Sequence, residues 1–232
     1  MGSFRSSLFV ALLALVFGFI GAGVWQYTLG HQQTREYLLA NPEILPDLAN
    51  SYDRKQARER LADIEGEVLS PFPGAVLGNP DGAVTLVEFT DYGCTYCRMS
   101  REHVAALVAA NPDLKVVIRE WPIFDGSERA ARMALAAAKQ GKFTEFHDAM
   151  FRLGPPDDES VARAAAAAGL DVTQAEAVAA SQEVDFEIAK NLGLARQLAF
   201  TGTPSWVVGD QVLQGAVGQE ALAEAIAEAR GS

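Results

Sequence analysis

Cysteine is scarce in this sequence, which has only Cys94 and Cys97 among its 232 residues. A structural zinc site needs four nitrogen or sulfur ligands, and none of the three histidines, His31, His103 and His147, stands at zinc-finger spacing. Haem attachment requires a histidine directly after the second cysteine, where this chain has arginine. Neither metal-based interpretation of the cysteine pair is therefore favoured.

The chain also lacks any run rich in lysine or arginine. It has 19 basic and 30 acidic residues, which gives a net charge of −11. Because nucleic-acid binding depends on neutralising phosphates with a basic patch, we expect no nucleic-acid partner. The hydrophobic fraction of 49% is sufficient for a sizeable core in a chain of this length.

Charged residues are absent between Arg5 and Arg35, and residues 8–29 read LFVALLALVFGFIGAGVWQYTL. As a helix with ~1.5 Å per residue, this segment would span roughly 33 Å, enough for a ~30 Å hydrocarbon core. Trp25 and Tyr27 stand at its outer end, where aromatic rings favour the membrane interface. Residues 8–29 are therefore predicted to anchor the chain in the inner membrane.

A cleaved signal peptide is the alternative interpretation of residues 1–33. Gly21 and Gly23 would supply the small residues that cleavage requires. In both cases the remainder of the chain leaves the cytosol. The expected location is the periplasm, anchored or soluble, where an oxidising environment lets disulfides persist.

Residues 34–70 are predicted to form a helical stalk. Two apolar stripes at helical spacing follow each other along it, the first at Leu45, Leu48 and Tyr52, the second at Ala57, Leu61, Ile64 and Val68. The stripes fit a helix that folds back on its own domain, and they also fit a stalk that forms a homo-oligomer through residues 35–69. Residues 70–82 are rich in proline and glycine and are interpreted as a linker.

The hydrophobic pattern changes period at Ala83. Residues 83–90 (AVTLVEFT) and 114–122 (LKVVIREWP) are predicted strands, and the helical pattern MSREHVAALVAAN lies between them. The two cysteines fall between the first strand and this helix. A CxxC pair at that point of a βαβ unit is typical of a thioredoxin-like redox site.

The chemistry of a helix start supports this interpretation. Unpaired N–H groups there stabilise a thiolate, so we expect Cys94 to attack and accept disulfides. Cys97 lies one turn further on the same face and would resolve a mixed disulfide. The dithiol itself carries the electrons, so no cofactor or metal is required. The alternative is a non-catalytic copper-handling or chaperone-type module that uses the pair as a soft-metal clip.

The sequence EFTDYGCTYC resembles the active-site signature of the DsbA-like thiol–disulfide oxidoreductases. Residues 202–222 (GTPSWVVGDQVLQGAVGQEAL) resemble that family's cis-proline loop, hairpin and last helix, and YLLANPEIL resembles the start of its ScsC-like branch. The resemblance implies an α/β thioredoxin fold over residues 71–232 with an inserted all-helical cap. The alanine-rich residues 127–199 would form that cap as four or five helices.

Several further residues are candidates for the site. Glu88 stands in an otherwise apolar strand, and a buried acid there would relay protons for Cys97, in line with an acid at the matching family position. The resemblance implies a cis peptide bond before Pro204, with the backbone of Thr203 pairing with an extended substrate. Thr95 and Tyr96, between the cysteines, would also meet the substrate. We expect Asp91 and Tyr92 to shape the turn and His147 to be a packed structural histidine.

The predicted function is that of an exported protein thiol–disulfide oxidoreductase. Its partners would be cysteine-containing exported proteins and a membrane redox protein that recycles the dithiol. Whether the enzyme forms, reduces or isomerises disulfides is left open by the sequence. The threonine before the cis-proline and a stalk that could oligomerise favour isomerase or reductase within the family.

Overall fold

The structure is a computed structural model that describes residues 2–25 and 31–231, with side chains from residue 11 in the first stretch and from residue 33 in the second. The chain divides into two compact units, residues 1–53 and residues 54–232. The boundary falls inside helix α3 (Ile44–Ala62), so the second half of this helix belongs to the larger unit.

The smaller unit contains α1 (Gly2–Trp25), α2 (His31–Ala40) and the first half of α3. In the part of the chain that the structure describes, none of the helices combines the length and the apolar character needed to span a bilayer. The segment that the sequence predicts to span the membrane, residues 8–29, runs into residues 26–30, which lie outside the described residues. Anchoring therefore stays a prediction that the structure does not support.

The larger unit is built on a five-stranded sheet in the order β1-β3-β2-β4-β5. The strands are β1 (Val76–Gly78), β2 (Val84–Thr90), β3 (Leu114–Glu120), β4 (Ser205–Val208) and β5 (Gln211–Gln214). β2 and β3 pair in parallel, and the other pairs are antiparallel. Valine, leucine and isoleucine dominate β2 and β3, as expected for strands that are covered on both faces.

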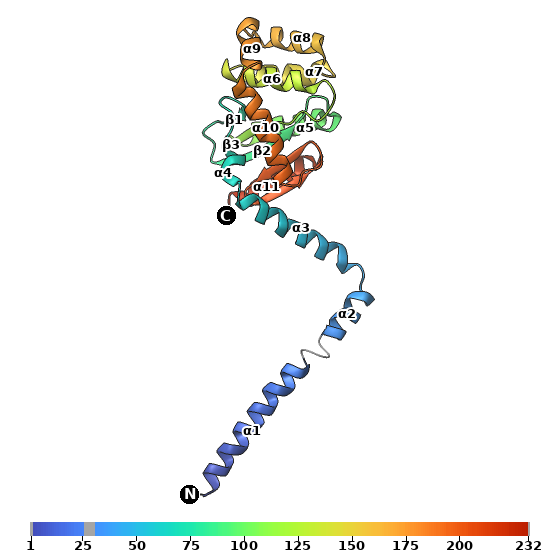
Figure 1. The fold of residues 1–232 in the computed structure, drawn as a ribbon, viewed down its shortest axis with the longest axis vertical. Coiled ribbons are helices and arrows are strands. Elements are labelled where there is room, and N and C mark those ends of the chain that lie inside the picture. The colour runs from blue at the N-terminus through green and yellow to red at the C-terminus, as the bar shows by residue number, and fades with distance from the viewer. Residues whose placement is uncertain (1, 26–30, 232) are drawn as a thin grey trace. The chain divides into compact units, whose positions relative to one another are not determined.

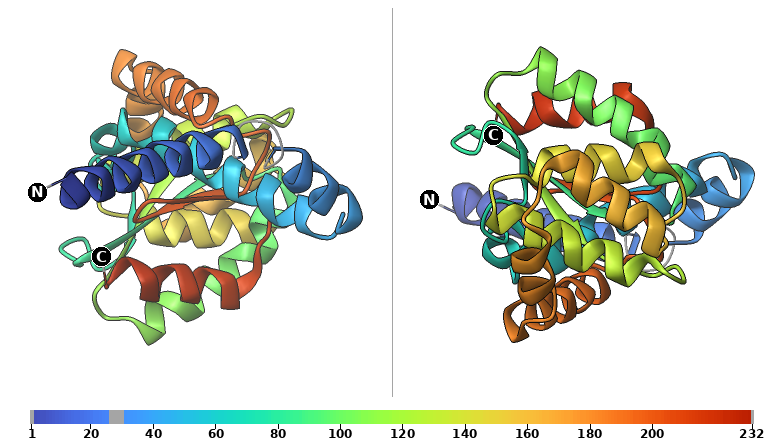
Figure 2. Two further views of the ribbon diagram at one scale, coloured as in Figure 1. Left: turned by 90° about the horizontal axis from the view of Figure 1, so that it is seen from below. Right: turned by 90° about the horizontal axis from the view of Figure 1, so that it is seen from above.

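Helices cover both faces of this sheet (Figure 1). In Figure 2, α5 (Thr95–Ala110) and α11 (Gly218–Ala229) lie together on one side of the strands, and α10 (Gln182–Gln197) lies on the other. Successive strand residues point to opposite faces. Leu86 thus joins the core beneath α5 and α11, whereas Val87 and Phe89 join a second core shared with α3, α4 (Glu65–Leu69) and α10.

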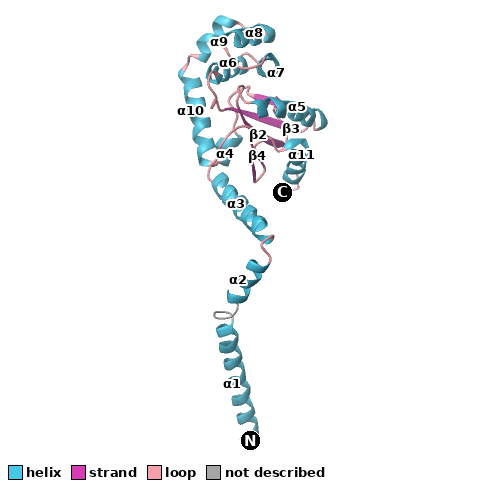
Figure 3. Ribbon diagram, turned by 90° about the vertical axis from the view of Figure 1, so that its right-hand side faces the viewer, coloured by secondary structure: helices cyan, strands magenta, loops and turns pink. Residues whose placement is uncertain are grey.

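A group of helices is inserted between β3 and β4, as the resemblance implied. It comprises α6 (Ser127–Lys139), α7 (Phe143–Leu153), α8 (Asp158–Ala168), α9 (Val172–Ala179) and α10. In Figure 3 the first four of these lie beyond one end of the strands, and α10 runs back along the sheet. Alanine occupies six of the nine buried positions of α6, which lets neighbouring helices approach closely. The fold is thus the expected thioredoxin-like α/β fold with additional helices.

The interpretation of residues 70–82 as a linker was wrong. Val76–Gly78 form the edge strand β1, paired antiparallel with β3, while Phe72 and Ala75 are buried in the main core. A three-residue strand is too short for an alternating pattern, and the prolines and glycines around it are equally typical of turns. The chain is therefore packed against the domain well before the first predicted strand.

The two stripes of the predicted stalk have different environments. Ala57, Leu61 and Val68, from the second stripe, are buried in the larger unit. Leu45 and Leu48, from the first stripe, stay about half exposed. The second stripe thus folds back on the domain, as one of the two interpretations required, and the first stripe remains uncovered in the single chain.

Candidate dithiol site

The two cysteines lie at the start of α5, directly after β2. Cys94 is the residue that precedes the first helical turn, and Cys97 is fully buried within that turn. Asp91 holds the connecting turn together through its carboxylate. Oδ1 accepts a hydrogen bond from the N–H of Gly93 at 2.6 Å, and Oδ2 accepts from the N–H groups of Ile123 and Phe124 at 2.6 and 2.9 Å. Asp91 therefore shapes the turn, as expected.

The loop before β4 meets the dithiol from the other side. The Thr203–Pro204 peptide bond is cis, as the resemblance implied. The Cys94 thiol donates a hydrogen bond to the carbonyl oxygen of Thr203, with Sγ and oxygen 3.2 Å apart. Residues that are more than a hundred positions apart in the sequence thus form one site.

The two thiols have opposite acidities. Hydrogen bonding from the Cys97 side chain lowers the pKa of Cys94 to about 5, aided by backbone N–H groups of Cys97 and Tyr96 and opposed by burial. Burial raises the pKa of Cys97 far above that of a free thiol, and the hydrogen bond to Cys94 and the charge of Glu88 raise it further. At neutral pH Cys94 is a thiolate and Cys97 a thiol.

Glu88 lies behind the dithiol, on the face of β2 that is covered by α5. Only 2% of its surface is exposed. Burial raises its pKa to about 8, more than the neighbouring Thr90 hydroxyl lowers it, and the Cys94 charge adds to the rise. A carboxyl that titrates near neutral pH beside a buried thiol can exchange protons with it.

A second cluster of buried polar side chains lies around the Tyr92 hydroxyl. Its hydroxyl donates a hydrogen bond to Oε1 of Glu120 at 2.9 Å and lies 3.0 Å from Nδ1 of His147. Burial raises the pKa of Glu120 well above its ordinary value and lowers that of His147 to about 4. The ring of His147 packs against Tyr92 and Phe151, so it is the packed structural histidine that we expected. Tyr92, in contrast, lies in the core and does not only shape the turn.

The surface around Cys94 is apolar and exposed. Tyr96 and Met99 on α5 are 60% and 55% exposed, and Ile123 and Phe124 on the neighbouring loop are 42% and 49% exposed. Thr95 is exposed at the first position of the helix. Single exposed apolar residues are ordinary, but these four lie on the first turns of α5 and on the loop that Asp91 connects to the turn before Cys94.

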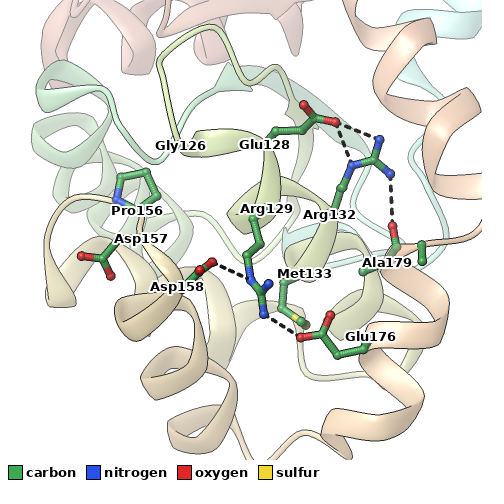
Figure 4. Close-up of a pocket in the computed structure, with 11 residues that line it drawn as sticks. Gly126, Glu128, Arg129, Arg132, Met133, Pro156, Asp157, Asp158, Glu176 and Ala179 are labelled. Carbon is green, nitrogen blue, oxygen red and sulfur yellow. Dashed lines mark hydrogen bonds and ion pairs between the residues drawn. The ribbon is translucent and has the colours of Figure 1, made fainter.

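A wide groove lies in the inserted helices, away from the dithiol. It has a volume of about 860 Å³ and is lined by residues of α6, α8 and α9 (Figure 4). Arg129 is paired with Asp158 and Glu176, and Arg132 with Glu128. Both arginines are thus neutralised, and the groove presents no unpaired positive charge to an anion.

Of the residues singled out from the sequence, the structure brings Cys94, Cys97 and Thr203 together. Sequence reasoning did not single out Glu120, Arg101 or Asp148. Glu120 ends β3, which also contains Lys115 and Arg119, so it lacks the signal that singled out Glu88, a lone acid in an apolar strand. Arg101 and Asp148 form an ion pair between α5 and α7, with Nη1 and Oδ1 2.9 Å apart. Nothing in the sequence relates these two positions, because the pairing depends on how α7 packs.

Among proteins of known sequence, the chain is similar to the Na(+)/H(+) antiporter NhaA 3 of Salinispora tropica, with 30% identity over 187 residues. The match covers 75% of this chain but only 28% of the antiporter, so the chain spans little more than a quarter of that relative. The similarity to the antiporter therefore concerns one part of it.

Solved structures match more of the fold. A thioredoxin-like oxidoreductase from Silicibacter pomeroyi is 45% identical, with a TM-score of 0.65 over 68% of this chain and 92% of that protein. The catalytic domain of Proteus mirabilis ScsC is 25% identical, with a TM-score of 0.68 over 75% of this chain and 99% of that domain. The ScsC-like resemblance of the sequence is thereby confirmed.

The family comparison agrees with these structures. Residues 85–227 match the DSBA-like thioredoxin domain, and this range runs from the second residue of β2 into α11. It thus includes both cysteines, the cis-proline loop and all the inserted helices. By this match the chain belongs to the DSBA-like thioredoxin domain family.

Proposed function

We propose that this protein is an exported thiol–disulfide oxidoreductase that acts on cysteines of other proteins through Cys94 and Cys97. The observation that supports it most is the opposite acidity of the two thiols at the start of α5. The thiolate is the nucleophile in disulfide exchange. Cys94 is therefore the sulfur that attacks first, and Cys97 stays protonated until it resolves the mixed disulfide.

The reductive direction illustrates the electron balance. The Cys94 thiolate attacks a substrate disulfide, which forms a mixed disulfide and releases one substrate thiolate. Cys97 then gives its proton to Glu88, and its thiolate attacks Sγ of Cys94. The Cys94–Cys97 disulfide forms, the bond from Cys94 to the substrate breaks, and the second substrate sulfur leaves with the electron pair. Oxidation of a substrate dithiol follows the same steps in reverse.

Substrate binding would use the backbone beside the cis-proline. Thr203 is 9% exposed, its carbonyl faces Cys94, and Pro204 fixes the turn of the chain there. An extended peptide could pair with this backbone as an added strand. Tyr96 and Phe124 would then cover apolar side chains of the peptide, with Thr95 at the edge. The enzyme would thus act on unfolded or loosely folded segments.

The further partners are proposals that follow from the sequence. A membrane redox protein would recycle the dithiol, and isomerase or reductase activity is the direction we favour. The periplasm is the proposed compartment, and attachment through residues 8–29 remains a prediction. Homo-oligomer formation through the first apolar stripe of residues 35–69 is considered below.

The decisive experiment is reduction of an unstructured protein disulfide by the full chain, with glutathione as the electron source. Wild type should turn over, and Cys94→Ser should lose at least about a thousandfold in rate because no thiolate remains to attack. Cys97→Ser should accumulate a mixed disulfide visible on a non-reducing gel. Failure to equilibrate with glutathione, with Cu(I) co-purifying on the two thiols, would instead support the soft-metal clip.

A further inference from the structure

We infer that Asp91 is a positioning residue for substrate choice. Its carboxylate holds the loop that carries Ile123 and Phe124 beside Cys94, and the placement of this loop selects peptides with large apolar side chains next to their cysteine. The inference rests on the proposed function, because it names what sets the peptide preference of the same site. The carboxylate bonds to backbone N–H groups and to neither sulfur, so its effect on the reaction passes through the loop.

The loop between β3 and α6 has little regular structure to fix it. Residues 121–126 belong to neither a helix nor a strand. Pro122 has no N–H group to donate. The N–H groups of Ile123 and Phe124 both donate to Oδ2 of Asp91, at 2.6 and 2.9 Å. One carboxylate oxygen therefore holds the two residues of the loop whose apolar side chains are exposed.

The other oxygen of this carboxylate holds the turn that precedes the dithiol. Oδ1 accepts a hydrogen bond from the N–H of Gly93 at 2.6 Å. Only 1% of Asp91 is exposed, so water does not compete for these bonds. Hydrogen bonds to a carboxylate are about twice as strong as those between neutral groups. Asp91 thus joins the turn before Cys94 directly to the loop.

Glycine at position 93 allows the loop to approach the turn closely. A Cβ atom there would lie 2.7 Å from Oγ of Ser127 and 3.0 Å from Cβ of Phe124. Phe124 therefore packs against the residue directly before Cys94, and it is 49% exposed at that position. A peptide joined to Cys94 by a disulfide would meet this ring close to its own cysteine.

Tyr96 and Met99 supply the other half of the apolar surface. They stand on the first turns of α5, are 60% and 55% exposed, and are held in place by the helix itself. The loop half depends on Asp91, because without the carboxylate its two N–H groups lose their acceptor. A loop that is free to move must be ordered again when a peptide binds, which costs binding free energy. Loss of Asp91 should therefore weaken the binding of apolar peptides.

The experiment uses the full chain and two peptides, each with one cysteine that is joined to glutathione by a disulfide. Leucines flank the cysteine in one peptide, and serines flank it in the other. Reduced glutathione returns the electrons to the dithiol and becomes glutathione disulfide. Wild type should reduce the leucine peptide with a kcat/KM at least about tenfold higher than that for the serine peptide.

In Asp91→Ala this preference should fall below about threefold, mainly through a higher KM for the leucine peptide. Ser127→Ala is the matched control. It removes the second acceptor of the Gly93 N–H, at 3.2 Å, and leaves the loop bonded to Asp91, so the preference should stay that of wild type. An unchanged preference in Asp91→Ala would overturn the inference. An equal loss for both peptides would also overturn it, since Asp91 would then act on the dithiol.

A double-mutant cycle tests whether Asp91 acts through the loop. Phe124→Ala should lose much of the preference, and the double variant should be no less selective than Asp91→Ala alone. Additive losses would show that the two residues act separately. Where Asp91→Ala does not fold, Asp91→Asn, which keeps one acceptor oxygen, takes its place in the cycle. Reduction of the serine peptide by wild type tests the proposed function by itself, so failure of the function and failure of the inference are distinguishable.

Discussion

Sγ of Cys94 and the carbonyl oxygen of Thr203 lie 3.2 Å apart, joined by a hydrogen bond from the thiol. The contact brings the start of α5 against the loop before β4, so the reactive sulfur and the backbone that would bind a substrate are held together. When Cys94 is a thiolate, this hydrogen bond is lost and the carbonyl faces an anion. Stabilisation of the thiolate must then come from hydrogen bonds of the Cys97 and Thr203 side chains and of the N–H groups of the first turn.

The first prediction concerns that stabilisation. Because the hydrogen bond from Cys97 is the largest cause of the low pKa of Cys94, Cys97→Ala should raise this pKa from about 5 toward that of an ordinary thiol. Cys97→Ser keeps a donor at the same position and should give an intermediate value. Ultraviolet absorbance of the thiolate against pH measures both, and equal values for the two variants would show that the donor does not matter.

The second prediction concerns stability and Glu88. Its pKa is raised from 4.5 to about 8 on folding, so the folded protein holds this proton more tightly than the unfolded chain. Its contribution to stability is fully present below pH 4.5, falls as the pH rises, and is lost above about 8. Glu88→Gln should thus gain stability relative to wild type over this range, by several kcal/mol at most. Urea unfolding of both reduced proteins at several pH values measures the difference, and a difference that does not change with pH would contradict the expectation.

The third prediction concerns the buried ion pair between Arg119 and Glu187, whose Nη1 and Oε1 lie 2.7 Å apart. Arg119 also donates to backbone carbonyls of Glu67, Val68 and Ser70 at the end of α4. Arg119→Leu leaves several backbone carbonyls without their donor and leaves the buried Glu187 carboxylate with Lys190 as its remaining partner. It should lower the free energy of unfolding by about 3–5 kcal/mol. Arg129→Leu, which removes a half-exposed arginine from two ion pairs, should cost about 1 kcal/mol or less in the same urea titration.

The elements of the site could be predicted from the sequence because each has a strong local signal. The apolar runs that form β2 and β3 and the CxxC pair between them fix a βαβ unit. The positions of the cysteines relative to the cis-proline loop followed from the resemblance and not from any pattern in the residues. The contact between Cys94 and Thr203 depends on the complete sheet, since it joins the ends of two neighbouring strands.

What could not be predicted depends on packing between distant elements. β1 is too short to show a period, and its only signal, a few apolar residues between glycines and prolines, is shared with loops. The second apolar stripe has the same helical spacing as the first, but Leu61 is buried in a core that β2, β3 and α10 share, whereas Leu48 is half exposed. Periodicity identifies an apolar face without saying what covers it.

The fourth prediction concerns the first stripe, where Leu45, Leu48 and Tyr52 are 48–63% exposed in the single chain. If copies of the chain pair through it, the protein that starts at residue 34 should be larger than a monomer in light scattering. Leu45→Asp with Leu48→Asp should give monomers. Asn50→Asp with Ser51→Asp adds the same charge at other exposed positions of α3 and should leave the assembly intact.

Truncation offers a second check of this stripe. A chain that starts at residue 54 removes the first stripe and keeps the second, whereas one that starts at residue 71 also removes Leu61 and Val68 from the core and the carbonyl partners of Arg119. The shorter chain should therefore be unstable for a reason unrelated to assembly. Monomers from both residue 34 and residue 54 would leave the first stripe without a role in assembly.

The last prediction concerns how strongly the dithiol oxidises. Thr95 and Tyr96 occupy the first two positions of α5, and both are exposed, so they can be replaced without disturbing the core. Proline is well tolerated at the first helical position, where its missing N–H would be unpaired anyway. A histidine at position 96 would place a positive charge beside the Cys94 thiolate when protonated. Thr95→Pro with Tyr96→His should therefore lower the pKa of Cys94 below about 5.

A lower pKa stabilises the reduced form, and a more stable reduced form makes the disulfide a stronger oxidant. The double variant should thus equilibrate with glutathione at a higher potential than wild type, by roughly 30 mV for each 1.4 kcal/mol gained by the thiolate. Thr95→Ala with Tyr96→Phe is the matched control and should leave both quantities near those of wild type. If the double variant changed neither the pKa nor the potential, the two residues between the cysteines would not control the reaction. The pKa of Cys94 and the potential would then be set by the groups behind and beside Cys94, namely Glu88 and Thr203.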